Sequence, residues 1–98
     1  MVMTAQVEDL LERTSDILPV TNQDIIFRGI TAELMERIVQ LKRYRATLEG
    51  KHGDLEMLEQ QMKEQGVSPD DHTLYTDLLE WRAINHEIPE LMAILESM

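Results

Sequence analysis

Apolar residues recur every three or four positions along most of this chain, and this period limits the possible folds more than any other feature. A helix that faces a core repeats its apolar side chains at this spacing, whereas a strand alternates at every second residue. The pattern is uninterrupted over residues 31–49 and 70–88. It predicts an all-α fold, either an elongated bundle of three to four helices or a helical hairpin, with coiled-coil-like packing and no sheet.

A proline and a capping box separate the first two predicted helices. The first covers about residues 4–18, and the proline that follows ends it because proline cannot continue a helix. Thr21 and Asp24 resemble a capping box with a shorter acid, and the helix that they start reaches His52. Residues 25–29 read IIFRG and are also compatible with a short extended piece, although the period favours helix.

Two further helices follow in the second half of the chain. Asp54 can cap a short third helix, which Gly66 closes because glycine adopts the left-handed conformation at little cost. Residues 68–71 read SPDD, with a capping hydroxyl, a proline at the first helical position and two acids at the positive end of the helix dipole. They predict the start of a fourth helix. Pro89 should kink this helix, since it removes a hydrogen bond.

The apolar stripes of the second and fourth helices are expected to pack on each other. Trp81 should be buried between them, because a large aromatic side chain at helical spacing usually belongs to a core. Asn85 is the polar member of the stripe. It fixes register or oligomeric state, or bonds the carbonyl freed by the proline, or lies exposed at the edge of the stripe. The stripe residues are Ile26, Ile30, Leu34, Ile38, Leu41 and Leu48 on the second helix, and Leu74, Leu78, Trp81, Asn85, Ile88, Met92 and Leu95 on the fourth.

Length and composition indicate a single helical domain over residues 1–98. The chain contains no cysteine, and its polar start lacks the basic region and apolar run of a signal peptide. No apolar run approaches the ~18 residues that would span a bilayer. We therefore expect a cytoplasmic protein that neither spans nor binds a membrane.

The charge distribution disfavours nucleic acid as a partner. The chain carries a net charge of −10, whereas binding to phosphates is driven by Lys and Arg. Residues 22–53 carry +2 and residues 68–98 carry −6. Residues 42–45, KRYR, could touch a nucleic acid backbone, but their simpler use is to pair with the acidic fourth helix and set its orientation.

The sequence predicts no metal and no cofactor. Di-iron bundles need a Glu-x-x-His pair from each of two helices, and this chain has only Glu49 with His52, at a helix end. All three histidines are instead expected to face solvent. Nucleophilic hydrolysis is not indicated either, because cysteine and a Gly-x-Ser-x-Gly serine are both lacking.

One enzymatic alternative rests on the pairs Glu33-x-x-Glu36 and Glu56-x-x-Glu59. They resemble the paired motifs with which small all-α nucleotide pyrophosphohydrolases of the MazG kind hold Mg²⁺ against a nucleoside triphosphate. Carboxylates on neighbouring helix faces suit such a hard cation. The second motif departs from the family pattern, which ends in Asp where this chain has Glu59.

A second resemblance covers about a third of the chain. Residues 53–87 read GDLEMLEQQMKEQGVSPDDHTLYTDLLEWRAINHE, with a Gly-x-Leu-Glu-x-Leu-Glu stretch and an acidic Asp-Leu-Leu-Glu-Trp segment. This stretch looks like the C-terminal part of the small acidic helical antitoxins of prokaryotic toxin–antitoxin pairs. The resemblance implies a neutralising role against a basic toxin.

The favoured function is a non-enzymatic protein-binding module with a basic protein partner. Acids of the fourth helix flank or oppose its apolar stripe, so most should face outward and form an uncompensated binding surface. A homodimer is also expected, because the second helix would be roughly 45 Å long while a globule of this size is about 30 Å across. The predicted partner-binding acids are Asp70, Asp77, Glu80, Glu87 and Glu90.

Overall fold

The computed structural model describes residues 4–66 and 72–98, and these form four α-helices without any strand. The predicted all-α class is therefore confirmed. The chain divides into two compact units, Met1–Glu33 and Leu34–Met98, with the boundary inside the second helix. That the whole chain behaves as one domain stays a prediction.

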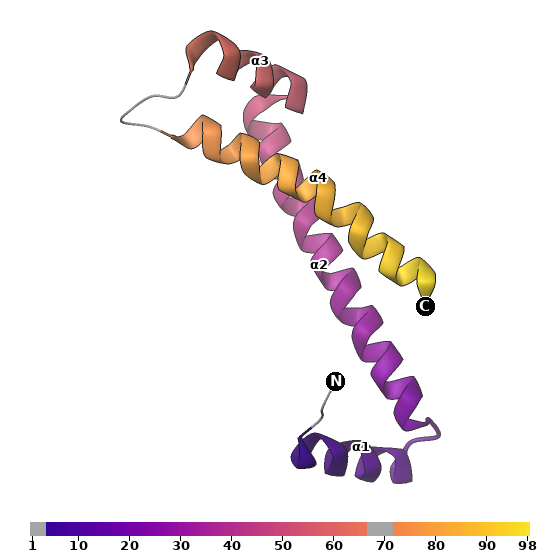
Figure 1. The fold of residues 1–98 in the computed structure, drawn as a ribbon. Coiled ribbons are helices and arrows are strands. Elements are labelled where there is room, and N and C mark those ends of the chain that lie inside the picture. The colour runs from indigo at the N-terminus through magenta and orange to yellow at the C-terminus, as the bar shows by residue number, and fades with distance from the viewer. Residues whose placement is uncertain (1–3, 67–71) are drawn as a thin grey trace. The chain divides into compact units, whose positions relative to one another are not determined.

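The first unit holds α1, Ala5–Ile17, and the start of α2, Asn22–His52 (Figure 1). The Thr4 hydroxyl caps α1 by accepting the N–H of Val7 at 3.2 Å, which satisfies one of the free donors at the helix start. The helix ends before Pro19, as predicted. No residue of α1 is buried.

Thr21 and Asp24 form the predicted capping box of α2. The Asp24 N–H donates to the Thr21 hydroxyl at 3.1 Å, and the Thr21 N–H donates to the Asp24 carboxylate at 3.2 Å. The bond from the Thr21 backbone stabilises the charged carboxylate and so lowers the pKa of Asp24 below its ordinary value. Because α2 begins at Asn22, residues 25–29 are helical, which confirms the favoured of the two expectations.

Glycines and one acid shape both ends of α3, Leu55–Gln65. Gly53, with φ of 83°, follows α2 in the left-handed region that glycine enters without strain. Asp54 then caps α3, and its carboxylate accepts the Met57 N–H at 2.7 Å. Gly66, with φ of 69°, closes the helix. Both predicted ends of the third helix are confirmed.

The last helix, α4, spans Thr73–Ser97 and packs on α3. It continues through Pro89, so this proline does not end it, and the kink expected there stays a prediction. The predicted cap at residues 68–71 lies outside the described residues. Among the helices that the structure does describe, none combines the length and hydropathy needed to cross a membrane.

The second unit encloses the core. Trp81 is 3% exposed and packs in one cluster with residues of α2, α3 and α4, so its predicted burial is confirmed. Leu34 is partly buried, whereas Asn85 and Met92 lie exposed at the edge of the α4 stripe. Ile26 and Ile30 were also predicted to pack, but both are exposed and lie in the first unit, outside the core. The buried apolar residues are Ile38, Leu41, Leu48, Leu58, Leu78, Trp81, Ile84 and Ile88.

Candidate functional site

Polar contacts within the second unit join α2 to α4 and run in antiparallel order. Residues late in α2 meet residues early in α4, and residues nearer the middle of α2 meet residues further along α4. Of the stretch 42–45 that was predicted to pair with the acidic fourth helix, Tyr44 bonds an acid and Arg45 bonds the neutral Asn85, whereas the arginine that pairs with an acid of α4 is Arg37. The pairs are His52 with Asp77, Tyr44 with Glu80, Arg45 with Asn85, and Arg37 with Glu87.

His52 and Asp77 form a pair that is almost closed off from water. The His52 Nε2 lies 2.7 Å from the Asp77 carboxylate, and their side chains are 10% and 9% exposed. A carboxylate loses its hydration on burial, and this contact replaces it in part. The expectation that every histidine faces solvent is wrong for His52. Asp77 likewise does not face outward, because its position on α4 points its side chain toward His52 at the end of α2.

Tyr44 donates its hydroxyl hydrogen to the Glu80 carboxylate. The hydrogen bond, together with burial and the nearby negative charges of Glu80 and Asp77, raises the pKa of Tyr44 to about 12. The phenol therefore stays protonated far above neutral pH. This contact holds Glu80 inside the molecule's own polar network.

Two ion pairs on the surface of the second unit complete the network. Arg37 donates to both carboxylate oxygens of Glu87, at 3.1 and 3.3 Å, and Arg82 donates to Glu59 of α3 at 3.2 Å. The side chains of both pairs are between 36% and 54% exposed. Exposed pairs contribute at most ~1 kcal/mol, so they favour one orientation of the helices more than they stabilise the fold.

The predicted acidic surface of α4 is largely engaged within the chain. Asp77 is buried and therefore cannot belong to an exposed binding face, which corrects that prediction. Glu80 and Glu87 already bond α2. Glu90 contacts His86 at 3.0 Å, one turn away on the same exposed face. Asp70 lies outside the described residues.

The glutamates of the enzymatic alternative are not gathered into a metal site. Glu33 and Glu36 lie one turn apart on α2, and Glu56 and Glu59 lie on α3. Glu59 is already paired with Arg82. Within residues 4–66 and 72–98, no three His, Asp or Glu side chains lie together as a metal site would require.

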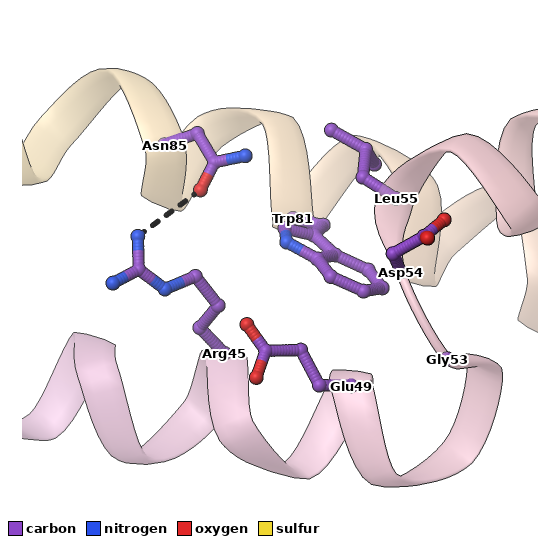
Figure 2. A pocket seen from close by; sticks show the side chains of 7 residues that line it. All are labelled: Arg45, Glu49, Gly53, Asp54, Leu55, Trp81 and Asn85. Carbon is purple, nitrogen blue, oxygen red and sulfur yellow. Dashed lines mark hydrogen bonds between the residues drawn. The ribbon is translucent and has the colours of Figure 1, made fainter.

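An open pocket of about 440 Å³ lies where α2, α3 and α4 meet (Figure 2). Trp81 and Leu55 supply its apolar wall, while Arg45 and Glu49 project from α2. Arg45 donates to the Asn85 side chain at 3.3 Å across one side of the pocket. Asn85 is exposed at the edge of the stripe, as one of its three expectations has it, and a role in register or oligomeric state stays a prediction. The remaining lining residues are Gly53 and Asp54.

Sequence reasoning missed His52 and Arg37 as members of the polar network, whereas Tyr44 and Arg45 belong to the stretch 42–45 that it assigned to contacts with the fourth helix. A signal for His52 was present, because it follows the buried Leu48 by four residues and so shares its face of α2. The same step of four links Asp77 to Trp81 on α4. Reading polar residues on the apolar face as partners of one another would have identified this pair.

Comparison of the chain with known protein families, with curated proteins and with solved structures found no match.

Proposed function

We propose that the chain is a non-enzymatic protein-binding module with a basic partner, and that α1 carries the binding face. One observation supports this proposal: α1 is an amphipathic helix that buries none of its residues. A helix with a continuous apolar face usually covers that face with another element, because exposed apolar surface is costly in water. An apolar groove on another protein can bury this face in the same way.

The apolar residues of α1 and its end lie on one side of the helix. Leu10 and Leu11 follow Val7 by three and four residues, and Ile17 follows Leu10 by seven, so these side chains lie along one side of the helix. Ile17 is 83% exposed, and the others are also well exposed for apolar side chains. Besides Ile17, the stripe comprises Val7, which is 43% exposed, Leu10, which is 51% exposed, Leu18, which is 48% exposed, and Leu11, which is half-buried.

Acids form a second row on α1 that supports a basic partner. Glu8, Glu12 and Asp16 are exposed and follow one another in steps of four. Like charges at this spacing disfavour a helix by ~0.2–0.5 kcal/mol per pair. Within the described residues of the first unit, none of the three has an ion-pair partner, whereas Asp9 pairs with Arg13 at 3.4 Å. Lys and Arg along the rim of the partner's groove would offset this repulsion.

The α1 surface differs in this respect from the acids of α4, which have partners within the chain. That Glu80, Glu87 and Glu90 also touch the partner stays a prediction. The resemblance of residues 53–87 to antitoxins supports a specific form of the same proposal, in which the chain neutralises a basic toxin.

The proposal is tested by affinity purification from the source cells, using two variants that each add one carboxylate to α1. Leu10→Asp places it in the apolar stripe, and Ala5→Asp places it on the acidic side. We expect a basic protein that the wild type and Ala5→Asp retain, that Leu10→Asp loses, and that elutes as salt rises, because salt screens charge pairs. Equal retention by both variants would contradict a binding role for the stripe.

We also propose that the chain forms a homodimer when the partner is absent. The support comes from the first unit, where Ile26, Phe27 and Ile30 of α2 remain 39–44% exposed. Apolar residues grouped in this way favour association, and a second copy of the chain is always available to supply the matching face.

A further inference from the structure

The pocket beside Trp81 combines an apolar wall with one unused carboxylate. Trp81 and Leu55 form the wall, and Figure 2 shows the Glu49 side chain reaching from α2 into the space below the indole ring. The volume of about 440 Å³ falls within the range of about 300–1,000 Å³ that is typical of ligand pockets, so it has room for one long side chain. The pocket is open, so a side chain of another protein can enter it without any movement of the helices.

Glu49 stands apart from the other carboxylates near this junction. Asp77, Glu80 and Glu87 are each bonded to α2, and Glu59 is bonded to Arg82. Glu49 has no hydrogen-bond or ion-pair partner for its carboxylate in the part of the chain that the structure describes. Glu49 is exposed, so its carboxylate is accessible to a cation that enters the pocket.

We propose that this pocket receives a lysine or arginine side chain of the basic partner, an inference that rests on the proposed function. The aliphatic stem of such a side chain packs along Leu55, beside the small exposed part of Trp81, and its charged head bonds Glu49. Both halves of the amphipathic side chain thus meet a matching surface.

The charges around the pocket favour a cation over an anion. Arg45 is the one cation among the lining residues, and its guanidinium donates to Asn85 at the side of the pocket. Glu49 and Asp54 are both acids, and Asp54 uses one carboxylate oxygen to cap α3. The lining therefore carries a net negative charge. Arg45 also repels a second cation, so the charged head lies at the Glu49 side.

Fluorescence of Trp81, the only tryptophan in the chain, provides the test. The intact protein is titrated with N-acetyl-lysine amide and, separately, with N-acetyl-norleucine amide, which has a similar stem but no charge. We expect a saturable change in emission with the lysine compound and a much weaker one with the norleucine compound. Equal responses to the two compounds, or no saturable response to lysine, would overturn the proposal.

Two exposed glutamates provide matched variants for this titration. Glu49→Gln should weaken binding of the lysine compound about fivefold, which corresponds to about 1 kcal/mol of lost ion-pair energy. Glu36→Gln removes the same charge from another part of α2 and should leave binding unchanged. Equal affinity in Glu49→Gln and the wild type would exclude the assigned role of Glu49. The Leu10→Asp variant separates the two proposals, since it loses the partner through α1 but should keep the lysine response.

Discussion

At the scale of single residues, the polar network depends on side chains that are stable in a buried position only when a hydrogen-bond partner lies close to them. Asp77 is the one charged residue that the structure buries among residues 4–66 and 72–98. Its carboxylate is tolerated there because His52 lies 2.7 Å away. The pair therefore specifies how the end of α2 meets the start of α4, more than it adds stability over an apolar contact.

Removing His52 alone should be costly. In His52→Leu the Asp77 carboxylate stays buried without this partner, and we expect the free energy of unfolding to fall by about 1–3 kcal/mol. The double variant His52→Leu with Asp77→Leu replaces both groups by apolar ones and should recover most of the loss. Urea denaturation followed by circular dichroism measures both values. A double variant as unstable as the sum of the single variants would contradict this account.

Tyr44 should make stability depend on alkaline pH. Its pKa is raised from the ordinary value of 10.0 to about 12 in the folded protein. The folded state therefore holds this proton more tightly than the unfolded state does. The stabilisation is complete below pH 10 and is lost as the pH rises from 10 to about 12.

The measurement compares urea denaturation of the wild type and Tyr44→Phe across this pH range. The two proteins differ only at residue 44, so the difference in their stability isolates Tyr44. We expect the wild type to lose its advantage over Tyr44→Phe as the pH rises. A difference in stability that stays constant with pH would show that the bond to Glu80 does not control the proton.

At the scale of elements, two glycines three residues apart have opposite roles. Gly50 lies inside α2, and a Cβ built there would have no neighbouring atom within 4 Å. Gly53 follows the helix with φ of 83°, and a Cβ there would lie 2.7 Å from the sulfur of Met57. The first glycine weakens the helix, while the second allows the chain to turn into α3.

Alanine substitutions should separate these roles. Gly50→Ala should stabilise the protein by about 0.5–1 kcal/mol, because alanine loses less backbone entropy in a helix. Gly53→Ala should destabilise it by about 1–2 kcal/mol, since an L-residue in the left-handed region is strained. Thermal unfolding of the two variants gives the comparison. A stabilising Gly53→Ala would imply a different turn between α2 and α3.

At the scale of the whole molecule, association is the property that the exposed apolar residues predict. Sedimentation equilibrium of the isolated wild type should show a dimer at micromolar concentration. Ile30→Asp should shift the protein to monomer without unfolding it, because Ile30 is 44% exposed and does not belong to the core. A monomeric wild type at high micromolar concentration would refute the homodimer.

The sequence by itself determined the helices and most of their ends. Thr21 with Asp24, Asp54 and Gly66 act on backbone groups within four residues of themselves, so their effects can be read locally. The burial of Trp81 was also readable, because the apolar period repeats along one helix.

Only the tertiary structure decided which polar groups meet. His52 and Asp77 are 25 residues apart in the chain, Tyr44 and Glu80 are 36 apart, and Arg37 and Glu87 are 50 apart. Each residue of a helix is rotated by about 100° from the one before, so a shift of one residue between α2 and α4 would turn these side chains away from each other. The acids that the sequence assigned to a partner were therefore placed by the register of the two helices, which no local pattern contains.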